Sequence, residues 1–185
     1  MTEPERLFMN PITRFFVRAK HWQVFALLIG LSCIAEAVVM WTYPKSVSLI
    51  AAELCWVCFV VWFWSLGSFL DSLVEPDLRL SRPFFRFALA YPLVYMGVFQ
   101  IIPFEKLTLG YGFAIFPLHL FAMFCVFFDL NFVSKSLALA ETGRAVSFYD
   151  YAGAFFLLWF FPLGIWFVQP RINRLYAGTL NRQTA

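Results

Sequence analysis

Long runs of apolar residues, separated by short polar stretches, dominate this chain. Four runs, 22–41, 46–70, 84–102 and 111–130, are close to the roughly 20 residues that a helix needs to cross a bilayer. A fifth run, 151–168, is just long enough. The pattern therefore predicts an all-α fold, a polytopic transmembrane helix bundle with four spans and a fifth hydrophobic segment that proline and glycine interrupt.

The polar stretches are too short to form a soluble domain. Of the 185 residues, 62% are hydrophobic and 14% are charged, and each polar stretch has the length of a connector. We therefore expect one integral membrane domain over residues 1–185, with a short N-terminal segment, 1–21, before the first span. Its partners are expected to be the lipid bilayer and a protein partner or a second copy.

Local signals mark several helix ends. Asn10-Pro11 predicts a helix start ahead of the first span, and segment 81–83 does the same for the third. Residues 147–150 resemble a capping box before the fifth run. Gly143 is expected to end an extension of the fourth helix.

Basic residues predict the orientation. Nine of them flank one set of span ends: Arg6, Arg14, Arg18, Lys20, Arg79, Arg82, Arg86, Lys135 and Arg144. Only Lys45 and Lys106 lie in the alternate loops. By the positive-inside rule the N-terminus is cytoplasmic. The net charge of +3 comes from these flanks, so it reports orientation and does not indicate nucleic-acid binding.

The fifth run allows two paths. A kinked but complete crossing is the simpler fold, and it would leave Arg171, Arg174 and Arg182 outside. A break at Pro162-Leu163-Gly164 would instead give a re-entrant or interfacial helix pair and keep these arginines inside, as the charge rule prefers. Five crossings are the expectation on grounds of simplicity.

Polar residues within the runs suggest a common layer. Glu36, Glu53 and His119 fall roughly 7–11 Å below the outer interface at 1.5 Å per residue, and Gln100 lies near the outer end of its span. Such groups are costly in hydrocarbon unless they are paired or hydrated. Three readings stay open: a hydrogen-bonded clasp between helices, a proton- or cation-handling site, and a divalent metal site.

Two cysteines form a C-x-x-C in the second run, Cys55-Trp56-Val57-Cys58. At this motif the chain distantly resembles the membrane thiol oxidases of the DsbB and vitamin K epoxide reductase group, which implies a redox pair beside a quinone. The second cysteine pair of that group is missing from the outer loops. Small packing residues are the alternative interpretation.

At the inner boundary of the spans, Arg86 and Asp129 are placed to form a pair; snorkelling of Arg86 to water is the alternative. The sequence contains no phosphate loop, nucleophile–base arrangement or metalloprotease motif, and it indicates no cofactor.

A second resemblance lies in the lead-in Lys20-His21-Trp22, in 132–137 and in the closing block 162–173, which has the pattern P-x-G-x-W-x-x-Q-P-x-x-N. These segments look like those of uncharacterised bacterial multi-pass membrane proteins. The resemblance implies a bacterial inner membrane and no activity. The expected function is a non-enzymatic assembly or interaction subunit; the alternatives are an ion, proton or solute pathway and a thiol–quinone oxidoreductase.

Overall fold

The computed structural model describes residues 9–41, 45–101 and 109–184. Within these ranges it describes the side chains except at 35–36, 38–41, 45–49, 51–52, 101, 109–112, 114 and 182–184. The described chain is all α-helical, without strands. Its helices are α1 (Pro11–Arg18), α2 (His21–Trp41), α3 (Lys45–Leu73), α4 (Arg82–Ile101), α5 (Leu109–Thr142), α6 (Phe148–Trp159) and α7 (Phe161–Thr184), with a short 3-10 turn, η2 (Pro76–Leu78), between α3 and α4.

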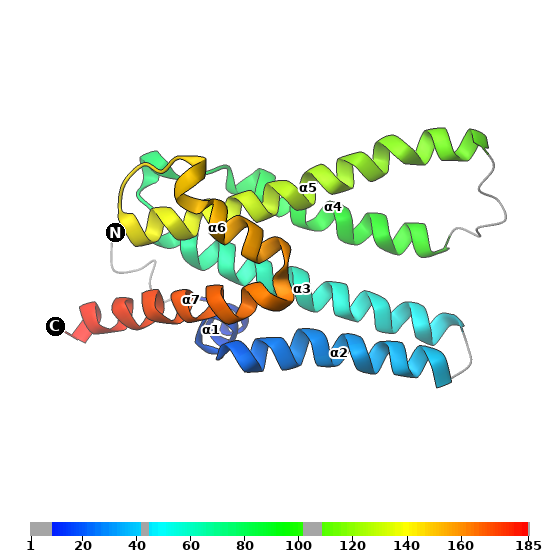
Figure 1. Ribbon diagram of the computed structural model, residues 1–185, viewed down its shortest axis with the longest axis horizontal. Helices are drawn as coiled ribbons and strands as arrows, with labels where there is room; N and C mark the ends of the chain where they lie inside the picture. The colour runs from blue at the N-terminus through cyan, green and yellow to red at the C-terminus, as the bar shows by residue number, and fades with distance from the viewer. Residues whose placement is uncertain (1–8, 42–44, 102–108, 185) are drawn as a thin grey trace.

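Helices α2 to α5 run along the length of the molecule, and the chain reverses direction at each end (Figure 1). The α3–α4 and α5–α6 connections lie at the same end, on the left of the view, whereas α2 ends and α3 begins at the opposite end. Helix α1 is seen nearly end-on, so it crosses the long axis of the bundle. The first four apolar runs therefore coincide with α2, α3, α4 and α5.

The local signals for helix ends are confirmed. The Asn10 side chain accepts a hydrogen bond from the Ile12 amide at 3.1 Å and so caps α1. Ser147 and Asp150 form the predicted capping box at the start of α6. Gly143 has a φ of 64°, the left-handed conformation that glycine adopts most readily after a helix, and α5 ends one residue earlier.

The fifth apolar run is interrupted, as predicted, and the continuous kinked helix that a complete crossing would need is wrong. Helix α6 ends at Trp159, and the Phe160 carbonyl accepts hydrogen bonds from the Leu163 and Gly164 amides within a tight turn. Helix α7 then runs back to the end at which α6 began, and the tip between them stays well short of the far end of α2 to α5 (Figure 1). Residues 148–184 form a helical hairpin.

Glycine at 164 makes the hairpin possible. A Cβ atom there would collide with the Leu157 carbonyl on α6, so a larger residue would push the two helices apart. The amides of Phe160, Leu163 and Gly164 are all hydrogen-bonded within the hairpin, so these backbone donors at the break have partners. The break in this segment, which the charge rule preferred, is therefore present in the structure.

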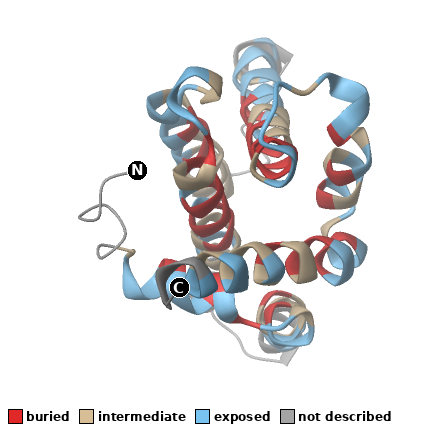
Figure 2. Ribbon diagram, turned by 90° about the vertical axis from the view of Figure 1, so that its left-hand side faces the viewer, coloured by how far each residue is buried: buried red, intermediate tan, exposed pale blue. Residues whose placement is uncertain are grey.

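The core lies in the half of the bundle that contains α1, α6 and α7. Among the described side chains, buried residues of α3 begin at Trp62, those of α4 end at Leu89 and those of α5 begin at Ala122. Viewed from this end, buried positions face the interior of the bundle (Figure 2). Phe85 and Phe132 stack there at 4.1 Å between ring centroids, beside Gly67, which leaves room for the Phe85 ring.

Two helices are long and apolar enough to cross a membrane over their described residues, Glu53–Leu73 of α3 and Ile115–Thr142 of α5. A shorter apolar helix covers His21–Ile34 of α2. By length and composition alone, two such helices are weak evidence of membrane association.

Candidate functional site

The structure joins two members of the predicted polar layer. Glu53 on α3 accepts a hydrogen bond from the Gln100 amide on α4 at 2.8 Å. Gly97 lies opposite the carboxylate, and a Cβ atom there would sit 3.1 Å from Glu53 Oε1. The missing side chain at 97 thus lets the carboxylate approach α4. We call Glu53 and Gln100 the outer polar pair.

His119 has a different partner. Its Nδ1 lies 3.2 Å from the hydroxyl of Tyr95 on α4, and the residue is exposed. The side chain of Glu36 lies outside the described residues. The described side chains contain no group of three histidine, cysteine or acidic residues that could hold a metal ion. Two of the four predicted members therefore meet, and His119 forms a separate pair with Tyr95.

Cys55 and Cys58 are free thiols, each half-buried on α3. They are one turn apart on the same helix, between Glu53 and the start of the buried core at Trp62. Cys58 packs against that core together with Phe59. The contact is what the packing interpretation expects, and the redox reading stays a prediction.

The predicted Arg86–Asp129 pair does not form. The Arg86 guanidinium lies over the Trp64 ring, 5.3 Å from its centroid, a cation–π contact. Asp129 is 95% buried, and its Oδ1 has no hydrogen-bond partner in the described structure. The ion pair at this level joins Arg82 to the buried Asp71 instead.

The most extensive polar contact joins the two ends of the chain. Gln169 on α7 is fully buried, and its amide donates to the carbonyls of Phe16 at 2.7 Å and Ala19 at 3.0 Å. Asn173, one turn later, donates to the carbonyls of Val17 at 2.6 Å and Ala19 at 3.2 Å. These carbonyls belong to the last turn of α1 and to its C-cap residue, Ala19, where a helix leaves carbonyls without internal partners. We call the two side chains the α1 clamp.

Neighbouring contacts extend this junction. Trp62 on α3 donates its indole N–H to Gln169 Oε1 at 3.4 Å. His21 and Trp166 lie 4.6 Å apart between ring centroids. The Gln23 side chain accepts a hydrogen bond from the Lys20 amide at 2.8 Å and so caps the start of α2. Segments 20–22 and 162–173, which carry the resemblance to bacterial membrane proteins, are thus in contact.

Sequence reasoning gave Gln169 and Asn173 no role. The available signal was their spacing, because residues four apart lie on the same face of a helix. A glutamine and an asparagine on one face beside an apolar run need hydrogen-bond partners when buried. Their partners lie some 150 residues earlier in the chain, which no local pattern reveals.

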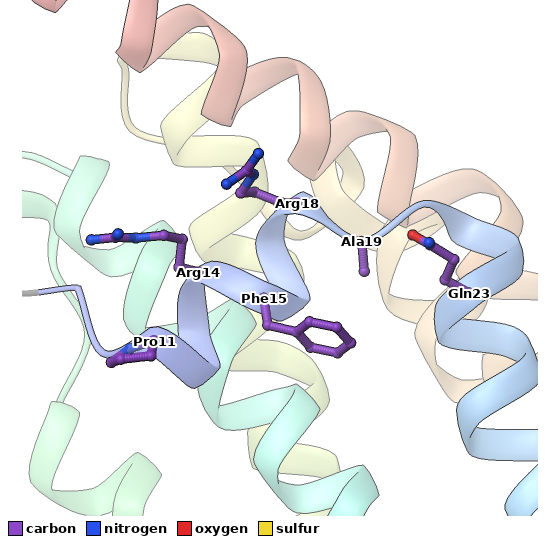
Figure 3. Close-up of a pocket in the computed structure, with 6 residues that line it drawn as sticks. All are labelled: Pro11, Arg14, Phe15, Arg18, Ala19 and Gln23. Atoms are coloured by element: carbon purple, nitrogen blue, oxygen red, sulfur yellow. The ribbon is translucent and has the colours of Figure 1, made fainter.

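A pocket opens at the elbow between α1 and α2 (Figure 3). It has a volume of about 420 Å³ and is lined by Pro11, Arg14, Phe15, Arg18, Ala19 and Gln23. The Arg14 and Arg18 side chains extend from the same side of α1, and Phe15 extends from the other (Figure 3). The pocket therefore combines two cationic groups with an aromatic one.

Comparison of the chain with protein-family models, with curated proteins and with solved structures finds no match.

Proposed function

We propose that this chain is an integral membrane protein with four crossings and one re-entrant hairpin, and that it acts as a non-enzymatic assembly or interaction subunit of a bacterial inner membrane. The exposure of its apolar helices supports the membrane part. Only 39% of the most apolar stretch of α3 and 28% of that of α5 is buried. A core helix of a water-soluble protein would be largely buried.

The exposed apolar side chains are large and contiguous along the helices. Phe113 and Phe116 on α5 are 77% and 61% exposed, and Val94 on α4 is 64% exposed. Exposed apolar surface costs about 25 cal/mol per Å² in water, and monomeric soluble proteins rarely carry such patches beyond a few hundred Å². Hydrocarbon is the solvent that suits these helices.

The hairpin supports the proposed orientation. Arg171 on α7 forms an ion pair with Glu141 at the end of α5, with Nε 2.8 Å from Oε1. The arginines of α7 therefore share an end with the α5–α6 connection, which is the end rich in basic residues. A cytoplasmic location for that end agrees with the positive-inside rule.

The outer polar pair supports a packing clasp within the bundle over an ion-carrying carboxylate. Glu53 and Gln100 bond to each other across α3 and α4, and in a bilayer such bonds stabilise helix association. A carboxylate that carries an ion or a proton needs access to water. The short connectors at the basic end, and the surface around them, are where we expect a protein partner to bind.

The decisive experiment measures ion and proton flux in proteoliposomes that contain the purified protein alone. We expect flux no greater than in empty liposomes, together with co-purification of a defined membrane partner after in vivo cross-linking. Flux well above that of empty liposomes would overturn the proposal.

A proton pathway is the second candidate, because Asp129 is a buried carboxyl group with one unpartnered oxygen among the described residues. Buried ionisable groups in membrane helices often serve proton transfer. If this candidate is right, Asp129→Asn abolishes proton flux, whereas Asp150→Asn, at the exposed start of α6, leaves it unchanged.

A further inference from the structure

Two arginines, Arg14 and Arg18, line the elbow pocket. Within the described chain neither Arg14 nor Arg18 forms an ion pair or a side-chain hydrogen bond. Arg82 and Arg171, in contrast, are each paired with a carboxylate. Two guanidinium groups one helical turn apart offer a set of donors suited to a phosphate, whose oxygens accept several charge-assisted hydrogen bonds.

The same pocket offers an apolar wall. Pro11 and Phe15 line it, and Phe15 is 57% exposed. Ile12 on α1 and Trp22 in the first turn of α2 are also about half exposed. The opposite face of α1, with Thr13, Phe16 and Val17, is buried against the bundle. A ligand that uses the whole site has an anionic head and a hydrocarbon tail.

The α1 clamp fixes this geometry before any ligand binds. Gln169 and Asn173 hold the carbonyls at the end of α1, and the elbow between α1 and α2 is only two residues long. Helix α1 crosses the long axis of the bundle, as an amphipathic helix at a membrane interface does. Such a helix places its basic residues at the level of lipid headgroups.

We propose that this pocket binds an anionic phospholipid, with Arg14 and Arg18 holding the phosphate and Phe15 packing against the acyl chains. The inference rests on the proposed membrane location and adds a specific lipid site to it. The charge of the two arginines selects an anionic headgroup over a zwitterionic one. The apolar wall selects a lipid over a free phosphate.

The test uses native mass spectrometry of the full-length protein in detergent, with phosphatidylglycerol as the probe and phosphatidylcholine as the reference lipid. We expect phosphatidylglycerol to bind more tightly. The double variant R14Q/R18Q should weaken it about 25-fold, since each basic residue near an anionic surface contributes about fivefold. Arg174→Gln, at an exposed arginine outside the pocket, is the matched control and should change binding less than about twofold.

A second arm identifies the source of the phosphate. Glycerol phosphate, which has the headgroup without the chains, should not displace the lipid, and Phe15→Ala should weaken lipid binding while both arginines remain. The inference would be overturned if R14Q/R18Q bound phosphatidylglycerol as tightly as the wild type, or if Arg174→Gln lost as much affinity as R14Q/R18Q. Displacement of the lipid by glycerol phosphate would overturn it as well.

Alkaline extraction of membranes separates this failure from failure of the proposed function. A protein that stays in the membrane but shows no preference for phosphatidylglycerol overturns the lipid site alone. A protein that carbonate removes overturns the membrane location and the lipid site with it.

Discussion

At the scale of single residues, Glu53 is a carboxylate on an apolar helix, and its bond to Gln100 explains how α3 tolerates it. Replacement by glutamine preserves the shape and an acceptor for the Gln100 amide. Replacement by leucine removes this acceptor and leaves that amide with only its longer hydrogen bond, 3.3 Å, to the Met96 carbonyl. We expect Glu53→Leu to lower the free energy of unfolding by about 1 kcal/mol, and Glu53→Gln to lower it by less.

The measurement is an unfolding titration in mixed micelles. Leu54→Met, at the exposed neighbouring position, is the matched control and should be near neutral. Equal stability of the leucine and glutamine variants would mean that the outer polar pair is not a clasp. Loss of an ion flux in a normally folded Glu53→Gln protein would favour the transport alternative instead.

Asp150 makes α6 sensitive to pH. The backbone amide of Ser147, the Ser147 hydroxyl and the nearby Arg144 lower the pKa of this carboxyl below its usual value of 3.8. Its folded-state pKa lies below its unfolded value, so its stabilisation is fully present above the unfolded pKa. That stabilisation is lost as pH falls from about 3.8 through the folded pKa.

We therefore expect the first turn of α6 to exchange amide hydrogens faster as pH falls through this range, after correction for intrinsic exchange. In the Asp150→Asn variant, the corrected exchange rate of this turn should no longer depend on pH in this range, since asparagine does not titrate. An unchanged pH dependence in Asp150→Asn would show that another group controls this turn.

Roles of single residues could be predicted where the interacting residues are close together in the sequence, and could not where they are far apart. The capping roles of Asn10, Ser147 and Gly143 could be predicted because a cap and its helix are adjacent in the chain. For Glu53 and Gln100, the sequence predicted only that both side chains lie at a similar depth along their helices, and it did not predict their contact. Depth follows from counting residues, but the rotation of each helix about its axis is set by packing, and this rotation directs His119 to Tyr95.

At the scale of elements, α1 depends on α7 for its C-terminal end. Gln169 donates hydrogen bonds to the carbonyls of Phe16 and Ala19, and Asn173 donates to those of Val17 and Ala19. Gln169→Leu leaves buried carbonyls with fewer partners and should cost about 1–3 kcal/mol. Asn173→Leu should cost less, because Asn173 is only partly buried.

The double variant tests the shared carbonyl. Either single variant leaves Ala19 with one donor, whereas the double leaves it with none, so its loss should exceed the sum of the two single losses. Unfolding titrations give the energies, and hydrogen exchange of residues 11–18 should rise in step with them. Unchanged exchange of α1 in the double variant would show that the clamp does not hold this helix.

At the element scale the apolar runs predicted the helices α2 to α5, whereas the continuous helix expected for a complete fifth crossing was wrong. Pro162 and Gly164 were recognised as a possible break, but a helix can also pass such residues with a kink. The outcome depends on the close approach of Gly164 to the Leu157 carbonyl and on the bonds between α7 and α1. These contacts between distant segments are absent from any window of sequence.

At the scale of the whole molecule, the parts fall into two halves. One half has the buried core, the α1 clamp, the hairpin and the paired arginines. In the other half, α2 to α5 extend beyond the hairpin, and the outer polar pair links α3 to α4. The proposed crossings, the hairpin and the basic end are consistent with one orientation of the molecule in the membrane. In this orientation α7 returns to the side from which α6 starts.

This orientation predicts the side of each loop in a cysteine-labelling experiment. In a background without the four native cysteines, single cysteines replace Glu75 in the α3–α4 connection, Ala177 on α7 and Lys106 between α4 and α5. Glu75 and Ala177 are exposed, and the hairpin brings α7 back to the end that holds the α3–α4 connection.

We expect a membrane-impermeant maleimide applied to intact spheroplasts to label Lys106→Cys and to spare Glu75→Cys and Ala177→Cys. Both spared positions should react after the membrane is opened, which is the control for their accessibility. A complete fifth crossing would instead place Ala177 with Lys106. Labelling of Ala177→Cys in intact cells, with Glu75→Cys still protected, would therefore contradict the hairpin while leaving the other four crossings in place.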